Sequence, residues 1–276
     1  MSVPPAKDRL DLEGLTALAG RIRSVQGWLA PREAWELHAV ARRAAEETGG
    51  RGRAVEIGSW RGRSTVVIAL GLRAGGGGRL MSIDPHELAD ERHAEVQRNL
   101  EEAGVRDLVD VVRAFSHDAR PQAPDGAADL VFIDGDHAYA SVRQDLDDWA
   151  SAVRSGGVIA FNDPLWPGPA RLLLERATGT GAVLRNGRLI VNTMFFDYRP
   201  DAAWTAEDAE LARRLRRMLQ FGRVWYRALR RLRRWHGHRP ATERFARSGG
   251  WVLRRLYPAI DLVHYGQLGR PDGPGG

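Results

Sequence analysis

The amino-acid sequence predicts an α/β fold built on a doubly wound, mostly parallel sheet. Between residues 50 and 197, short apolar segments alternate with longer amphipathic ones, as strands and helices do in βαβ units. The alternation closes on an Asn-Gly pair between two apolar segments, a pattern typical of a hairpin. We therefore expect a seven-stranded sheet that ends in an antiparallel hairpin strand, with helices before it and a basic helical extension after it.

The composition is that of an ordinary soluble protein. The chain has 276 residues, of which 43% are hydrophobic and 28% charged. It contains no cysteine, which excludes disulfides, thiolate nucleophiles and cysteine zinc sites. Residues 1–8 lack an apolar signal core, and the apolar runs are too short to span a membrane. These features predict a cytoplasmic protein.

Two helices are expected within residues 8–48, ahead of the sheet. Leucines recur at helical spacing in the first, and the second begins at Pro31, a residue type favoured in a first helical turn. We assign residues 1–49 to a helical lid over the ligand cleft. Packing of these helices against the sheet explains the same pattern.

Polar residues follow the predicted strands, at the edge where an open parallel sheet binds ligands. The strands and the residues after them are 54–57 before Gly58, 79–83 before Asp84, 109–113 before Ser116 and His117, 129–133 before Asp134, and 157–161 before Asn162 and Asp163. Helices are expected from residue 64, over 89–103 and over 138–153. The hairpin is expected over 182–185 and 188–191, with Asn186-Gly187 as a type I′ turn.

The turn after the first strand favours a cationic ligand. Gly58 and Gly62 let the backbone approach a ligand closely, and the helix that follows directs free N–H groups at the turn. A dinucleotide site requires a middle glycine, but that position is Trp60, and Glu56 would repel a phosphate. The ammonium and sulfonium groups of S-adenosylmethionine suit such a turn. A strand–turn–helix unit without a ligand has the same pattern.

The stretch from Glu56 to Ser64, Glu-Ile-Gly-Ser-Trp-Arg-Gly-Arg-Ser, resembles the cofactor motif of catechol-type, metal-dependent O-methyltransferases. The later strand ends resemble the same family and its sugar-methylating relatives. The resemblance covers residues 50–197 and implies a Rossmann-like class I methyltransferase fold, of which an antiparallel last strand is typical, with an S-adenosylmethionine-binding core. The implied cofactor contacts are Glu56, Gly58 and Ser64 at the methionine end, Asp84 at the ribose, and Ser116, His117 and Asp136 by the adenine. Ser59, Trp60, Gly62 and Asp134 complete the implied cofactor-binding set.

The resemblance also implies a magnesium site formed by Asp134, Asn162 and Asp163 at two neighbouring strand ends. Oxygen ligands of this kind are those that Mg²⁺ prefers. The catechol enzymes have Asp-Asn where this chain has Asn162-Asp163, so the charge is equal but the order is reversed. Structural roles are the alternative, because Asp134 can cap the next helix and Asn-Asp-Pro can form a turn.

His137 is the candidate general base, and Asp134 the second candidate catalytic residue. The catechol enzymes have a lysine at the position of His137, and an imidazole exchanges its proton near neutral pH. A histidine at a helix start without a role is the alternative. Tyr139 lines the acceptor pocket or belongs to the core.

These features predict an S-adenosylmethionine-dependent, magnesium-dependent O-methyltransferase. Few aromatic residues cluster near the motifs, and this favours a hydroxyl of a sugar, glycoside or glycan over a flat aromatic acceptor. The alternatives are a metal-independent methyltransferase acting on RNA or another small molecule, and a membrane-associated interaction protein that keeps the fold without turnover.

The C-terminal part is basic. From residue 201 onward there are 16 arginines and seven acidic residues, so the net charge of +6 leaves the first 200 residues mildly acidic. We expect an amphipathic helical extension over 198–268 and a disordered Gly/Pro tail over 269–276. The helix can contact an anionic inner membrane face through 211–235, bind nucleic acid, or pack on the core or a second subunit. No RNA-binding strand pattern is present, so we do not expect binding to nucleic acid. We do expect the chain to form a homo-oligomer.

Overall fold

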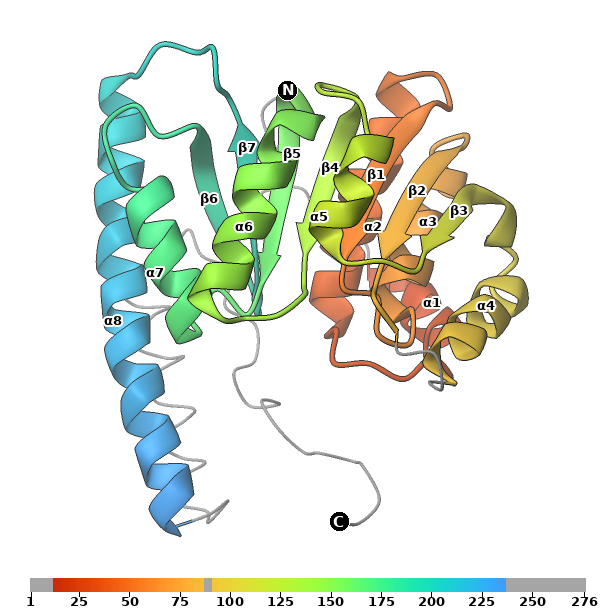
Figure 1. Ribbon diagram of the computed structural model, residues 1–276, viewed down its shortest axis with the longest axis horizontal. Coiled ribbons are helices and arrows are strands. Elements are labelled where there is room, and N and C mark those ends of the chain that lie inside the picture. The colour runs from red at the N-terminus through yellow and green to blue at the C-terminus, as the bar shows by residue number, and fades with distance from the viewer. Residues whose placement is uncertain (1–11, 87–90, 237–276) are drawn as a thin grey trace.

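In residues 12–86 and 91–236, which the computed structural model describes, seven strands form one sheet in the order β3-β2-β1-β4-β5-β7-β6 (Figure 1). Strand β7 is antiparallel to both of its neighbours, and the pairs formed among β1 to β5 are parallel. The predicted doubly wound sheet with an antiparallel final strand is therefore confirmed. The strands are β1 (Gly52–Ile57), β2 (Gly78–Ile83), β3 (Val109–Val112), β4 (Ala128–Ile133), β5 (Val153–Asn162), β6 (Leu184–Ile190) and β7 (Thr193–Tyr198).

Helices cover both faces of this sheet (Figure 1). One layer holds α1 (Leu12–Arg21), α2 (Pro31–Glu47), α3 (Arg63–Ala74) and α4 (Arg92–Glu102). The other holds α5 (Ser116–Ala119), α6 (Tyr139–Trp149), α7 (Pro167–Arg176) and α8 (Ala206–His236). Short 3₁₀ turns occupy Arg106–Leu108, Arg120–Gln122 and Ala150–Ala152.

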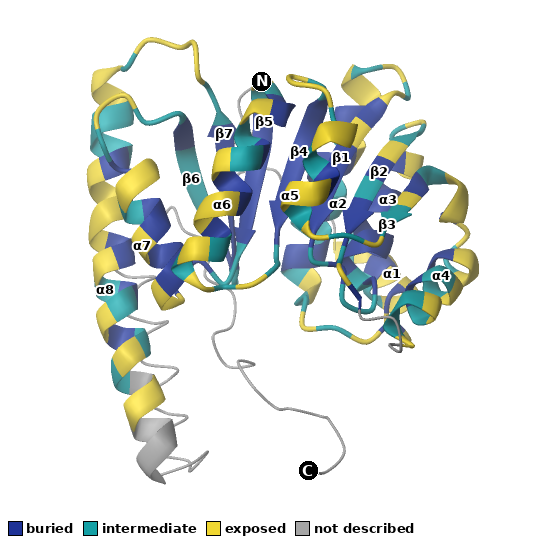
Figure 2. Cartoon of the chain, in the orientation of Figure 1, coloured by how far each residue is buried: buried dark blue, intermediate teal, exposed yellow. Residues whose placement is uncertain are grey.

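The central strands are buried on both faces (Figure 2). Because successive strand residues point to opposite sides, Val131 and Ile133 pack in the layer of α6 and α7, whereas Leu130 and Phe132 pack in the layer of α2 and α3. This double burial explains why the predicted strands are continuous apolar runs. It also leaves only the strand ends for polar chemistry.

The predicted hairpin turn at Asn186-Gly187 is wrong. Both residues lie inside β6 as a bulge, because the pairing with β7 shifts between Arg185 and Arg188, and the chain reverses after Ile190 instead. Asn186 adopts a φ of +52° and donates its Nδ2 to Asp197 Oδ2 over 2.8 Å. The Asn-Gly pair thus forms a β-bulge, which, like a tight hairpin turn, favours residues that tolerate unusual backbone angles.

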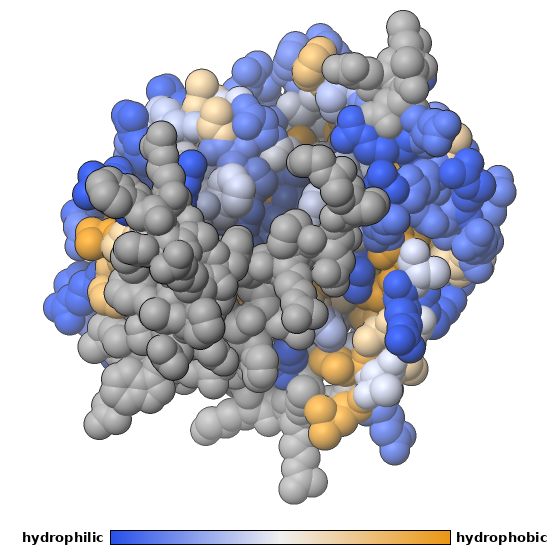
Figure 3. Space-filling model, turned by 90° about the horizontal axis from the view of Figure 1, so that it is seen from below, coloured by the Kyte–Doolittle hydropathy of each residue, from blue (hydrophilic) through white to orange (hydrophobic). Residues whose placement is uncertain are grey.

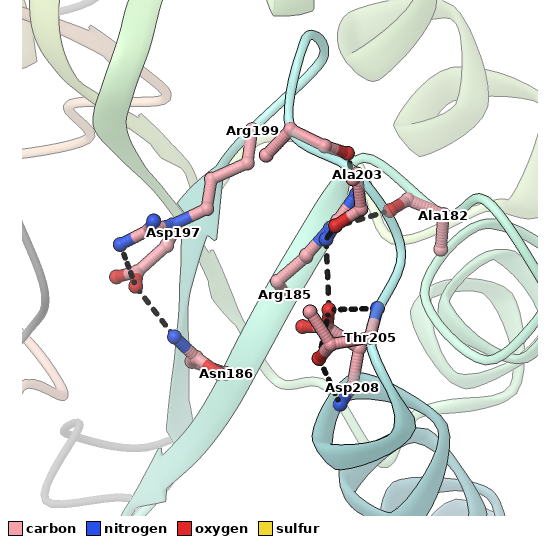
Figure 4. A network of polar contacts seen from close by, with 9 residues as sticks. Ala182, Arg185, Asn186, Asp197, Arg199, Ala203, Thr205 and Asp208 are labelled. Atoms are coloured by element: carbon pink, nitrogen blue, oxygen red, sulfur yellow. Dashed lines mark hydrogen bonds and ion pairs between the residues drawn. The ribbon is translucent and has the colours of Figure 1, made fainter.

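The long helix α8 is anchored to this bulged strand (Figure 4). The guanidinium of Arg185, buried in β6, donates to Asp208 Oδ2 over 2.9 Å and to the carbonyl of Ala203 over 2.7 Å. Asp208 also accepts from the backbone N–H and the hydroxyl of Thr205, so it closes the first turn of α8. One ion pair therefore fixes where α8 begins relative to the sheet.

The first half of α8 packs on the domain through its apolar face. Leu215, Met218, Leu219 and Trp225 are buried in the same layer as α7, and Gly222 lies against Leu165. This supports the predicted packing on the core, while contact of residues 211–235 with a membrane stays a prediction. Among the described residues, no helix combines the length and the apolar character that crossing a membrane requires.

The two predicted N-terminal helices are present, with α2 packed beside α3 and against the sheet. Their function as a lid stays a prediction. Residues 1–11, the part of the predicted extension beyond residue 236 and the predicted tail over 269–276 lie outside the described residues.

Candidate active site

The turn after β1 is held tightly between three strands. Gly58 has a φ of +89°, and a Cβ at this position would lie 2.2 Å from the carbonyl oxygen of Asp134. Its N–H donates to the carbonyl of Ile83 at the end of β2 over 2.8 Å. Gly62, with a φ of +84°, precedes the first residue of α3. Both glycines are therefore required by the backbone, and the turn brings β1, β2 and β4 together at one edge.

Glu56 is fully buried under this turn. Its Oε2 accepts hydrogen bonds from Thr65 Oγ1 over 2.6 Å and from Ser82 Oγ over 2.8 Å. Its Oε1 has no hydrogen-bond partner in the part of the chain that the structure describes. Burial raises the pKa of Glu56 to about 6, against the lowering effect of the nearby hydroxyl groups of Ser64, Thr65 and Ser82. One carboxylate oxygen is thus fixed by the protein, and the other is left for a donor or a cation.

Asp84, predicted as the ribose ligand, fastens the glycine turn. Its Oδ2 accepts from the backbone N–H of Ser59 over 3.0 Å and from that of Trp60 over 2.9 Å. Its Oδ1 accepts from the backbone N–H of His86 over 3.1 Å. A carboxylate oxygen can accept two hydrogen bonds, so Oδ1 of Asp84 can accept one more, for example from a hydroxyl. The ribose contact stays a prediction.

Trp60 sits in an aromatic and cationic setting. Its φ is +46°, its ring centroid lies 4.4 Å from that of Trp28, and the guanidinium of Arg61 lies 4.9 Å from its ring. Arg63 donates to the carbonyls of Val25 and Gly27, each over 3.2 Å. The segment between α1 and α2 therefore contacts the glycine turn, which is the position that the predicted lid over residues 1–49 would require.

The three residues predicted near the adenine all have protein partners. Ser116 donates to Asp145 Oδ1 over 2.5 Å, and Asp136 accepts from Ser141 Oγ over 2.6 Å. His117 stacks on Phe115, with ring centroids 5.8 Å apart. Phe115 is 59% exposed and offers a flat apolar face beside them. The contacts of these residues with an adenine stay predictions.

The predicted metal ligands and the predicted base meet at the ends of β4 and β5. Asn162 Nδ2 donates to Asp134 Oδ1 over 2.8 Å. His137 Nε2 lies 3.5 Å from Asp163 Oδ2 and 3.9 Å from Asp134 Oδ1, and it has no hydrogen-bond partner among the described residues. Asn192, in the β6–β7 connection, donates to Asp163 Oδ1. Residues from separate segments thus converge on one polar cluster.

This cluster concentrates negative charge away from water. Burial raises the pKa of Asp134 well above its usual range, with Asp163 adding repulsion, although 28% of the Asp134 side chain stays exposed. Burial also raises the pKa of Asp163, against the lowering effect of His137 and Asn192. Both carboxyl groups therefore favour a proton or a cation beside them.

A third carboxyl group, which sequence reasoning missed, supports the cluster from behind. Glu33 in α2 accepts from the backbone N–H of Asn192 and from Thr193 Oγ1, each over 2.9 Å. Burial raises the pKa of Glu33 to about 7. The sequence offered one signal for Glu33, a glutamate three residues after the N-cap position Ala30, where its side chain can cap the helix. In the structure its Oε2 does accept from the N–H of Ala30 over 2.8 Å.

In the described part of the chain, no three His, Asp or Glu side chains are arranged to hold a metal ion. The predicted set contains two carboxylates and one amide, and the amide of Asn162 turns its N–H₂ towards Asp134. Mg²⁺ is commonly held by one or two carboxylates with waters completing its shell. The donor chemistry of Asp134 and Asp163 therefore fits Mg²⁺.

Comparison with known proteins identifies the domain. Residues 55–164 match the family model described as a methyltransferase domain. This segment is therefore similar to methyltransferase domains. The matched segment begins within β1, contains the glycine turn and Asp134, and ends just after Asp163, so it includes both halves of the site.

The curated and solved relatives agree with this domain. A catechol O-methyltransferase of Mycobacterium tuberculosis (strain ATCC 25618 / H37Rv) is 35% identical in an alignment of 139 residues, and the match covers 45% of this chain and 58% of the relative. The match thus spans little more than half of that relative's length.

Two solved structures share the fold. The cofactor-bound Rv0187 from MTB has a TM-score of 0.51 at 21% identity and covers 73% of this chain and all of its own. The O-methyltransferase TomG from Streptomyces achromogenes, solved with S-adenosylmethionine and involved in tomaymycin synthesis, has a TM-score of 0.51 at 21% identity, covering 68% of this chain and 90% of its own. Together they establish a Rossmann-like methyltransferase fold.

Proposed function

We propose that this methyltransferase domain is an S-adenosylmethionine-dependent, magnesium-dependent O-methyltransferase acting on a hydroxyl of a sugar, glycoside or glycan. The observation that carries the proposal is the position of His137 beside Asp134 and Asp163, across the sheet edge from the Glu56 turn. A methyl donor and a deprotonated hydroxyl have to meet at such an edge. The named relatives, a catechol O-methyltransferase and an S-adenosylmethionine-bound O-methyltransferase, support the same chemistry.

Glu56 and the glycine turn would hold the cationic end of the cofactor. The free Oε1 of Glu56 suits a donor such as an ammonium group, and the N–H groups at the start of α3 suit a carboxylate. When bound, S-adenosylmethionine supplies a methyl group activated by its sulfonium, and Mg²⁺ supplies a charge that lowers the pKa of an acceptor hydroxyl. Asp134 and Asp163 would hold that ion, with Asn162 as the third donor.

His137 would remove the acceptor proton. Its Nε2 is without a hydrogen-bond partner among the described residues and faces the two carboxylates, which stabilise an imidazolium after proton transfer. Trp166, 38% exposed, lies with its ring 4.9 Å from that of His137. We expected few aromatic residues near these motifs, and Trp166 is an exception to that expectation. An aromatic ring at this position can pack against the apolar face of a sugar ring or against a flat aromatic acceptor.

Ligand binding followed by transfer tests the proposal. We expect S-adenosylhomocysteine to raise the melting temperature of the full chain and NAD to leave it unchanged. With labelled S-adenosylmethionine, label should pass to saccharide acceptors carrying neighbouring hydroxyls and not to RNA, and EDTA should abolish the transfer. A thermal shift with NAD alone, or full transfer in EDTA, would contradict the cofactor or the metal respectively.

A further inference from the structure

A cavity of about 660 Å³ opens beside His137 and is continued by the basic helix α8. Its walls include Asp136, Tyr139, Trp166 and Arg171 near the site, and Arg223, Arg227 and Arg230 from α8. Trp166 links the two parts, because its ring lies 4.9 Å from His137 and 5.9 Å from Tyr226 of α8. Figure 1 shows α8 running past the sheet edge where the parallel strands end. Figure 3 looks at the molecule from that side, and the part of the surface that is not grey is largely hydrophilic.

The three α8 arginines that line the cavity differ from two arginines nearer the start of the helix. Arg213 and Arg214 pair with Glu210 over 2.9 and 2.8 Å. Among the described residues, by contrast, no carboxylate pairs with Arg223, Arg227 or Arg230, and the Nε of Arg223 is buried without a partner. Unpaired guanidinium groups converging on a concave surface indicate an anionic ligand.

The spacing indicates the size of that ligand. Arg223, Arg227 and Arg230 follow each other at intervals of four and three residues, so they share one helix face and span about 10 Å along the axis. Arg171 is partly neutralised by Glu175, 3.0 Å away, and stacks on Tyr139. Asp136 also lines the cavity and offsets one of the three arginine charges. The remaining positive charge matches a phosphate or diphosphate ester, whose oxygens accept both N–H groups of a guanidinium fork.

We infer that the acceptor carries a phosphate or diphosphate ester, which the arginines at 223, 227 and 230 bind while its hydroxyl lies at His137. This inference rests on the proposed methyl transfer and names the class of its acceptor: a sugar phosphate, either free or linked to a lipid. Binding of the phosphate would orient the acceptor from the end remote from the reacting hydroxyl, a placement that raises the rate of transfer.

The test compares two triple variants of the full chain loaded with S-adenosylhomocysteine. Arg223→Gln, Arg227→Gln and Arg230→Gln remove the cavity charges, whereas Arg213→Gln, Arg214→Gln and Arg217→Gln remove equal charge from exposed positions of the same helix. Calorimetry with pyrophosphate and glucose 1-phosphate, and flotation with phosphatidylglycerol vesicles, measure binding at 150 mM salt. We expect the cavity triple to weaken binding by about tenfold or more and the exposed triple by less than about twofold.

The soluble probes and the vesicles distinguish a free sugar phosphate from a lipid-linked one. Cavity-dependent binding of glucose 1-phosphate supports a soluble acceptor, and cavity-dependent binding of vesicles alone supports a lipid-linked one. Equal loss in both triples, or no binding to any probe, overturns the inference. The thermal shift with S-adenosylhomocysteine, measured in the same samples, reports on the methyltransferase independently, so either proposal can fail while the other stands.

Discussion

The proposed role of His137 as general base can be tested directly by mutation. Its Nε2 has no hydrogen-bond partner among the described residues, so replacing the side chain should change catalysis more than stability. We expect His137→Gln to lower kcat by roughly 10²- to 10⁴-fold, the usual contribution of a general base, with the affinity for S-adenosylhomocysteine unchanged.

His137→Lys is the matched variant, because a lysine nitrogen can also accept a proton. It should restore part of the activity and move the optimum to higher pH, since a lysine loses its proton at higher pH than a histidine. Equal kcat values for His137→Gln and the wild type would remove His137 from the mechanism.

Glu56 should make cofactor binding depend on pH. Its pKa of about 6 means that it is largely ionised at pH 7 and becomes neutral as the pH falls below 6. Because an ionised carboxylate attracts the cationic cofactor, we expect the Kd of S-adenosylmethionine to rise roughly tenfold per pH unit below pH 6. Calorimetry between pH 5 and pH 8 measures this dependence.

Two variants test whether Glu56 is the group that causes this pH dependence. Glu56→Gln should bind weakly at pH 7 and lose the pH dependence, whereas Glu210→Gln, which changes an exposed carboxylate on α8, should keep the wild-type curve. A Glu56→Gln curve that still bends at pH 6 would assign the titration to another group.

At the scale of elements, the bulge in β6 shows what a local pattern can and cannot predict. The Asn-Gly pair indicates an unusual backbone, but whether this is a turn or a bulge depends on partners far along the chain. Here Arg185 is held by Asp208, and Asn186 by Asp197, so the strand continues past the pair. The helix α7 was not predicted for a related reason: its Pro167 start was visible, but its burial depends on α6 and α8.

The bulge makes a prediction about stability. A Cβ at Gly187 would lie 2.6 Å from Phe196 Cε1 and 3.3 Å from Leu215 Cδ2, so Gly187→Ala forces a buried ring and the first turns of α8 to move. We expect the free energy of unfolding to fall by about 1–3 kcal/mol. Gly179→Ala, at a position with nothing within 4 Å, should change it by less than about 0.5 kcal/mol. Urea denaturation of both variants checks this, and equal midpoints would show that β6 does not hold the described register.

At the scale of the molecule, the sequence predicted where the site lies better than what supports it. Strand ends of a parallel sheet share an edge, so Glu56, Asp134 and Asp163 could be placed together from the pattern of strands alone. Glu33 and Trp166 could not, because they reach the site through packing of α2 and α7 against distant segments. Local periodicity predicts topology, and long-range packing decides the surroundings of each reacting group.

The whole site should respond to a divalent cation as one unit. Asp134 and Asp163 are desolvated carboxyl groups that raise each other's affinity for positive charge, and Mg²⁺ competes there with protons. At ten times its Kd, Mg²⁺ should stabilise the fold by about 1.4 kcal/mol. This corresponds to roughly 3–6 °C in Tm at pH 8, with a smaller shift at pH 6 because the raised pKa values leave more protons on these groups.

Scanning calorimetry with Mg²⁺ and then EDTA measures the effect. Asp163→Asn should abolish it without straining the backbone, since asparagine tolerates the φ of +49° at that position, whereas Asp118→Asn at an exposed site should keep it. If the Asp163→Asn protein gained the same stability from Mg²⁺ as the wild type, the ion would be bound elsewhere. His137 would then face the two carboxylates as a metal-free acid–base cluster, and transfer would have to depend on these side chains alone.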